Sequence, residues 1–160
     1  ADNNTGAFGH FIVDLPEPTT LEALCAKLQT DIGLNGLRYI GNPGDTVRSL
    51  AIVGHLYPMD FGLKHADGTP AEYSVQLIRL LEERVDVLLP GEIIDWTVAS
   101  YVRDALQLGR KKALINLGHL NGEELGMRYA CQWLGDLLNH RLPVTYVPSQ
   151  DMYRFYIPQA

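Results

Sequence analysis

Several features that define large classes of proteins are missing from this sequence. Its 160 residues include two cysteines, Cys25 and Cys131, which are too few for a disulfide framework. No apolar run approaches the ~18 residues that a membrane-spanning helix needs. The N-terminal run ADNNTGAFGH has neither the basic nor the apolar region of a signal peptide. We therefore expect a cytoplasmic protein with reduced thiols and no membrane partner.

Basic residues are also scarce. Thirteen Lys and Arg against nineteen Asp and Glu give a formal net charge of −6, which argues against nucleic acid as a partner. No G-x-x-x-x-G-K-[ST] run is present, and no G-x-G-x-x-G run follows a predicted strand, so the common nucleotide-binding loops are excluded. A G-x-S-x-G run, typical of serine hydrolases, is missing too.

What remains is the composition of a folded domain. Hydrophobic residues make up 46% of the chain and charged residues 20%, which are ordinary values for a globular protein. The length predicts one domain over residues 1–160, with residues 1–20 as an extended leading segment. A helix is expected over 21–32, capped by Thr19 or Thr20 and ended by Gly33.

From residue 47 to 147 the pattern alternates between strands and helices. Apolar runs predict strands over 47–53, 85–89 and 113–117, and helices are expected over 70–84, 94–108 and from Asn121 to about 139. Shorter strands are expected over 37–40, 144–147 and 153–157, and an irregular stretch over 54–69. This alternation predicts an α/β fold, a single domain with a mostly parallel sheet and helices on both faces.

Chemistry-bearing residues follow each of the three central strands. Gly54-His55, Gly91-Glu92 and Gly118-His119 come directly after them. Ligands of open α/β sheets bind at the carboxyl ends of parallel strands. If the three strands are neighbours, His55, Glu92 and His119 point into one crevice.

The run GHLNGEELG carries the sharpest local signal. With Asn121 as the helix N-cap, Glu124 completes a capping-box-like pair with it. Glu123 is not needed for that cap, and it follows His119 by four residues across the mouth of the helix. An imidazole and a carboxylate held together suit Zn, Mn or Fe. The alternative for Glu123 is simple compensation of the helix dipole.

His55 and Glu92 each allow more than one interpretation. His55 is a further metal ligand, a substrate contact or a loop histidine. Glu92 follows a buried strand, where an acid is costly unless it is paired; it serves either a catalytic role or the capping of the helix that begins near Ile94.

The runs DVLLPGEIID, ALINLGHLNGEELGM and LPVTYVPSQD resemble the C-terminal half of the Nif-three-like family, also called type 2 homologues of GTP cyclohydrolase I. The upstream run from LPEPTTLEAL to VRSLAIVG is similar to the family's middle segment, so the resemblance covers nearly all of the chain. It implies a dinuclear metal centre between two α/β halves, often in a ring-shaped hexamer. By resemblance, His119 and Glu123 match metal ligands, and Glu92 matches the glutamate of the family's GE motif.

This sequence also departs from the family pattern. It has no His-His pair, and the N-terminal half that carries that motif is not recognisable here. The run GHLYPMDFG replaces a Gly- and Ser-rich turn, and IIDWT replaces a segment that tends to hold histidine. The resemblance implies a divalent metal (Zn, Mn or Fe), whereas these departures argue against a complete two-metal site and allow a rearranged site in which His55 takes part.

These observations predict a metal-binding domain that acts as a metal-dependent hydrolase on a small nucleotide-like or phosphate-type substrate, with Glu92 as the catalytic residue that orients or activates water. One alternative is a non-catalytic oligomerisation or interaction module without a complete metal site. Another is a metal-free binding domain whose pocket is lined by His55 and the 54–69 loop. The expected partners are a small-molecule substrate and further copies of the chain.

Overall fold

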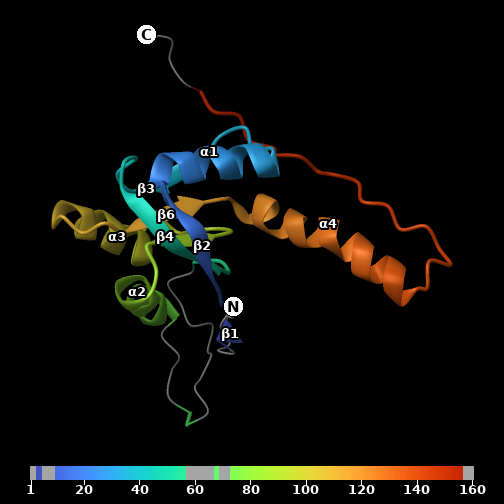
Figure 1. Cartoon of the computed structure of the whole chain (residues 1–160), viewed down its shortest axis with the longest axis horizontal. Helices are drawn as coiled ribbons and strands as arrows, with labels where there is room; N and C mark the ends of the chain where they lie inside the picture. The colour runs from blue at the N-terminus through green and yellow to red at the C-terminus, as the bar shows by residue number, and fades with distance from the viewer. Residues whose placement is uncertain (1–2, 5–9, 57–66, 69–72, 157–160) are drawn as a thin grey trace.

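The computed structural model describes residues 3–4, 10–56, 67–68 and 73–156. Within these residues the chain forms an α/β fold (Figure 1). The strands are β1 (Asn3–Asn4), β2 (His10–Thr20), β3 (Arg38–Ile40), β4 (Thr46–Val53), β5 (Val87–Pro90) and β6 (Ala113–Asn116). The helices are α1 (Leu21–Ile32), α2 (Tyr73–Glu83), α3 (Val98–Gln107) and α4 (His119–Leu137).

The sheet is mixed, and the expectation of a mostly parallel sheet was wrong. Its strand order is β1-β2-β4-β5-β6-β3. The central strands β4, β5 and β6 are parallel neighbours, as the alternating pattern predicts. The outer pairs β1–β2, β2–β4 and β3–β6 are antiparallel. The crossover helices fix only the direction of the strands that they join, so the flanking strands were free to run the other way.

Two buried clusters lie on alternate residues of the central strands. Val87, Ala113 and Ile115 pack with residues of α1, whereas Leu88 and Leu114 pack with α2 and α3. Every residue of β5 is buried, which agrees with its uninterrupted apolar sequence.

Helix α1 has the predicted bounds. Thr20 Oγ1 accepts a hydrogen bond from the backbone N–H of Ala23 at 3.2 Å. Gly33 ends the helix at φ 81°, a left-handed conformation that glycine adopts without steric cost.

Strand β2 extends through two prolines of the leading segment, residues 1–20, which was expected to be extended. Its pairing with β4 is interrupted between Asp14 and Thr19, and Pro16 and Pro18 lie in that interval. Proline has no N–H for a ladder and is tolerated at such an irregularity.

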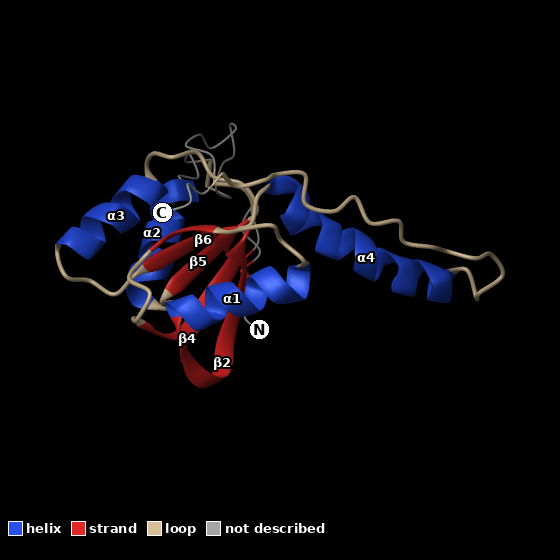
Figure 2. Ribbon diagram, turned by 90° about the horizontal axis from the view of Figure 1, so that it is seen from above, coloured by secondary structure: helices blue, strands red, loops and turns tan. Residues whose placement is uncertain are grey.

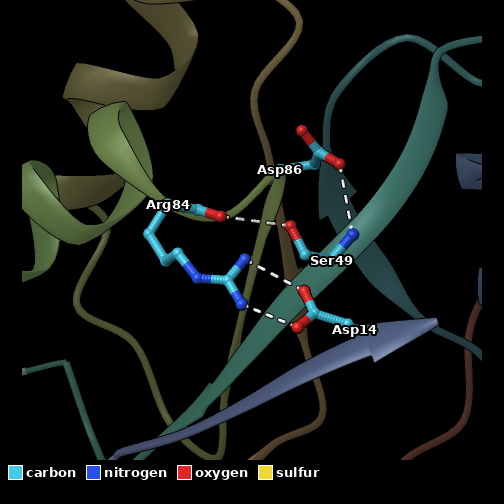
Figure 3. A network of polar contacts seen from close by, with 4 residues as sticks. All are labelled: Asp14, Ser49, Arg84 and Asp86. Carbon is cyan, nitrogen blue, oxygen red and sulfur yellow. Dashed lines mark hydrogen bonds and ion pairs between the residues drawn. The ribbon is translucent and has the colours of Figure 1, made fainter. Parts of the chain in front are cut away.

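The amino ends of the central strands are held by polar contacts (Figure 3). Arg84 donates two hydrogen bonds to the Asp14 carboxylate, at 2.9 and 2.7 Å, which lowers the pKa of Asp14. Ser49 donates its hydroxyl to the backbone carbonyl of Arg84, and Asp86 accepts the backbone N–H of Ser49. These contacts join β2, β4 and the turn before β5. They do not involve the residues at the carboxyl ends of the central strands.

The C-terminal part differs most from expectation. Helix α4 projects away from the sheet, and the chain then returns toward α1 (Figures 1 and 2). The strands expected over 144–147 and 153–157 are not formed in residues 144–156; residue 157 lies outside the described range. This segment is held instead by side chains, because Glu124 accepts hydrogen bonds from the Tyr146 hydroxyl (2.6 Å) and the Ser149 backbone N–H (2.5 Å).

One helix begins later than predicted, and the predicted start of another falls on residues that the structure does not describe. Helix α3 starts at Val98, later than the expected 94. Helix α2 starts at Tyr73, and the predicted start of its segment at residues 69–70 lies outside the described residues, as does most of the 54–69 stretch. Among the described residues, we find no helix with the length and apolar character needed to span a membrane.

Candidate metal centre

The candidate site lies where the three parallel strands end. After β4, β5 and β6 the chain supplies His55, Glu92 and His119. The segments that carry the first two remain paired beyond the strands, since Leu56 N–H donates to Glu92 O at 2.7 Å and Ile94 N–H donates to Leu56 O at 3.1 Å. This pairing places His55 and Glu92 side by side, as expected from the sequence.

Glycines allow these segments to approach closely. A Cβ on Gly91 would lie 3.2 Å from the ring of His55, and a Cβ on Gly122 would lie 3.0 Å from Gly91 Cα. The imidazole of His55 therefore rests against the backbone of Gly91, and the first turn of α4 contacts the same glycine. Gly118, with φ 87°, makes the turn from β6 into α4.

Helix α4 begins earlier than predicted, and this changes three assignments. It starts at His119, where the Gly122 N–H donates to Gly118 O. Asn121 is therefore not the N-cap; its side-chain amide donates to Leu117 O. Glu124 does not form a capping box, because its carboxylate binds Tyr146 and Ser149. His119 and Glu123 are an ordinary i, i+4 pair within the helix.

Four side chains meet at this edge of the sheet. His119 Nε2 lies 3.2 Å from Glu123 Oε1. His55 Nε2 lies 3.6 Å from the same oxygen. The two imidazole rings stack with their centroids 4.0 Å apart and an interplanar angle of 11°. His55 is the most buried of the group, with 25% of its side chain exposed, so the cluster has a protected side and a solvent-facing side.

Glu92 lies behind His119 and contacts its other ring nitrogen. Glu92 Oε2 is 2.9 Å from His119 Nδ1. An ionised carboxylate can only accept, and the contact with Glu92 is shorter than the 3.2 Å contact of Nε2 with Glu123. In the neutral ring Nδ1 therefore carries the proton, and the lone pair is on Nε2, toward Glu123. The hydrogen bond that His119 donates to Glu92, together with the charges of Glu123 and Glu92, raises the pKa of His119 against an opposing effect of desolvation.

The donor set fits a divalent metal. One ligand atom each from His55, His119 and Glu123 lies within 4.8 Å of the others. Two imidazoles and a carboxylate suit Zn, Mn or Fe, and a carboxylate on the far nitrogen of a ligating histidine is the usual supporting contact at such sites. The structure thus brings all four predicted residues together, and their roles as ligands and catalyst stay predictions.

A cavity of about 640 Å³ lies beside the cluster, and Glu92 and His119 line it. Its other walls include Arg38 of β3 and Arg154 and Phe155 of the C-terminal segment. Sequence reasoning did not find these residues. They are far in sequence from the residues that follow the central strands. The β3–β6 pairing brings Arg38 near the cluster, and the returning C-terminal segment brings Arg154 and Phe155 near it. The pocket predicted between His55 and the 54–69 loop falls largely outside the described residues.

No family model and no curated protein sequence matches this chain. Solved structures do share its fold. The Staphylococcus aureus protein SA1388 matches with a TM-score of 0.59 at 14% identity, over 92% of this chain and 42% of its own. A Bacillus cereus protein described as related to NIF3 matches with a TM-score of 0.58 at 19% identity, over 91% of this chain and 35% of its own. The protein ybgI, described as of unknown function, matches with a TM-score of 0.53 at 16% identity, over 94% and 48%.

These matches concern the fold alone, because all are below 25% identity. This chain spans less than half of the length of each of these structures. One of these structural neighbours is described as related to NIF3, the family that the motifs of this chain resemble. The chain therefore has the fold of a part of NIF3-related proteins, and it carries a possible His/Glu metal-binding group at the carboxyl edge of its central strands.

Proposed function

We propose that this chain binds a divalent metal and acts as a metal-dependent hydrolase on a small nucleotide-like or phosphate-type substrate. The observation that carries the proposal is the convergence of His55, His119 and Glu123 beside an open cavity. Three protein ligands leave room for water or substrate at the metal, the arrangement typical of catalytic rather than structural sites.

Each of the four side chains of the cluster has a role in this proposal. His55, His119 and Glu123 hold the metal, which when bound polarises the attacked group and lowers the pKa of water. Glu92 keeps the proton of His119 on Nδ1 and so presents Nε2 as the ligand atom. The action of Glu92 as a general base on water remains part of the proposal.

Calorimetric titration with zinc or manganese tests the metal site. We expect His119→Ala, Glu123→Ala and His55→Ala each to abolish or strongly weaken binding. His140→Ala is a matched control, because His140 Nε2 lies 3.2 Å from Asp136 Oδ1 in an i, i+4 pair of the same kind, with no further ligand in the described group. Equal affinity in the wild type and all variants would overturn the assignment.

Hydrolysis is tested separately, with the zinc- or manganese-loaded chain and a chromogenic phosphate monoester. We expect turnover that is lost on chelation and in His119→Ala and is retained in His140→Ala. Metal binding without any turnover would leave a metal-binding domain and remove the hydrolase from the proposal.

A second candidate is a non-catalytic module that assembles with further copies of the same chain. It is favoured by a stripe of large apolar side chains along α4, spaced four residues apart: Leu125, Tyr129, Trp133 and Leu137 are 41%, 64%, 50% and 69% exposed. Such a stripe can pack against the same stripe of a second copy. Metal content separates the candidates, since a pure assembly module binds no stoichiometric metal.

A further inference from the structure

The cavity beside the histidine cluster has walls from four parts of the chain. The end of β6 and the start of α4 form one wall, and Glu92 and Ile93 form the next. Arg38 of β3 lies opposite Asn116 of β6 in the antiparallel register. Asn116 is the last residue of β6, so Arg38 lies at the same end of the strands as His119. The last wall is the C-terminal segment from Asp151 to Phe155.

This C-terminal wall is fixed by the turn after α1. The backbone N–H of Asn35 donates to Asp151 Oδ2 at 2.9 Å, and its side-chain amide donates to the carbonyls of Asp151 (3.0 Å) and Tyr153 (2.7 Å). Phe155 packs on Gly36, where a Cβ would lie only 2.5 Å from the Phe155 ring. Arg154 is therefore held between two anchored residues at the rim of the cavity.

The acidic side chains that line the cavity form hydrogen bonds within the protein, whereas Arg38 has only a longer ion pair. Asp151 uses both carboxylate oxygens on backbone N–H groups, those of Asn35 and Tyr153. Glu92 bonds His119. The carboxylate that pairs with Arg38 is that of Asp95, 3.8 Å away and beyond hydrogen-bond distance, and both side chains are largely exposed. The two acids are thus committed to donors in the protein, whereas the guanidinium of Arg38 is available to a ligand.

The N-terminus of α4 adds further groups that can bind an anion. Gly118, His119 and Leu120 line the cavity, and the first N–H groups of a helix have no partner inside it. Arginine side chains and a helix N-terminus are the usual partners of phosphate. The remaining lining is apolar or aromatic, with Leu117, Met152, Tyr153 and Phe155.

From these contacts we propose that Arg38 and Arg154 bind the phosphate of a small substrate that also carries a flat ring, with the ring against the aromatic side chains of the C-terminal segment. This inference rests on the proposed function, because it places the substrate beside the candidate metal group. It adds two specificity-determining residues that lie outside that group, and it identifies the substrate class as nucleoside monophosphates rather than nucleosides.

The test measures binding of adenosine monophosphate, adenosine and inorganic phosphate to the metal-free chain in the presence of a chelator. We expect the monophosphate to bind at least tenfold more tightly than adenosine, with an affinity that falls as salt is added. Arg38→Gln and Arg154→Gln should each weaken monophosphate binding about tenfold or more, the range for a hydrogen bond to a charged group. Arg103→Gln is the control, since Arg103 lies on α3, where it contacts Asp104.

The same variants are titrated with zinc, and we expect unchanged zinc affinity in Arg38→Gln and Arg154→Gln. Monophosphate binding that is undetectable in the wild type, or equal in the wild type and both arginine variants, would overturn the inference. The zinc titration then shows independently whether the proposed metal function stands.

Discussion

His119 contacts a different carboxylate with each ring nitrogen, and the two contacts have different consequences. Glu92 on Nδ1 fixes which nitrogen carries the proton. Glu123 on Nε2 faces the lone pair of the neutral ring at 3.2 Å. Two negative groups that face each other in this way favour either a proton or a metal ion between them.

Removal of Glu92 should therefore weaken metal binding without touching a ligand. We expect Glu92→Ala to reduce zinc affinity by about 10–100-fold, the usual effect of losing such a supporting contact. Glu92→Gln keeps a hydrogen-bond acceptor and should recover part of this loss. Calorimetry against Asp95→Asn, a control on the same segment, measures the effect; equal affinity in Glu92→Ala and the wild type would contradict the orienting role.

The pH dependence follows from the raised pKa of His119, whose first cause is the hydrogen bond with Glu92. Protonated His119 pairs with both acids, so this contribution to stability is complete below the ordinary histidine pKa of about 6.5 and is lost as the pH rises through the raised value. Metal competes with that proton. Acidification should therefore lower the zinc affinity. Because the pKa of His119 is raised, this loss should begin at a higher pH than it would for a histidine with the ordinary pKa.

A proton NMR titration of the His119 ring, in the wild type and in Glu92→Ala, measures this pKa. The midpoint should be lower in the variant. A midpoint that is the same in both proteins would show that Glu92 does not set it.

At the scale of elements, the central strands and α1 could be predicted because their signals are local. A continuous apolar run such as VDVLL indicates a buried strand, and the Thr20 cap with Gly33 fixes both ends of α1. The antiparallel direction of β2 and β3 has no such local signal, since it depends on which sheet edge is open. Residues 144–156 also lack a local signal for their conformation. They contain residues that favour strands, but they form hydrogen bonds with Glu124 and Asn35 and have no strand partner.

The candidate site follows the same rule. His55, Glu92 and His119 could be predicted because each directly follows a central strand. Arg38 and Arg154 could not, because one depends on the β3–β6 register and the other on a segment that returns across the molecule. The start of α4 was missed because Asn121 is a good capping residue, yet its amide bonds Leu117 O within the folded turn.

Asn35 holds the C-terminal segment, and its removal should release that segment alone. Asn35→Ala deletes the two side-chain hydrogen bonds to the carbonyls of Asp151 and Tyr153. Because these bonds are exposed, we expect a loss of about 1–2 kcal/mol at most in the free energy of unfolding, together with faster proteolysis near residue 150.

The matched control for Asn35→Ala is Asn42→Ala, since Asn42 bonds only the nearby Asp45 among the described contacts. Urea unfolding and limited proteolysis of both variants check the expectation. Unchanged cleavage near residue 150 in Asn35→Ala would show that Asn35 does not fix the segment.

At the scale of the whole molecule, α4 projects away from the sheet that carries the site (Figure 2), and its apolar stripe is exposed. If a second copy packs there, Trp133→Glu and Tyr129→Glu place charge in that contact. We expect both to shift the chain to monomers in light scattering coupled to size exclusion, while zinc affinity is unchanged. A wild-type chain that is monomeric at all concentrations would remove the self-assembly proposal; Leu108→Glu, at the exposed end of α3, is the control.

The position of β3 at the sheet edge also has a consequence for the order of folding. Strand β3 precedes β4 along the chain, yet it pairs with β6, so Arg38 reaches Asn116 only after the chain between them is in place. Contacts between residues distant in sequence form slowly, because the intervening loop must first be closed. The histidine cluster needs only β4, β5, β6 and the start of α4, whereas the wall that carries Arg38 needs β3 as well, so the cluster can be complete before that wall is.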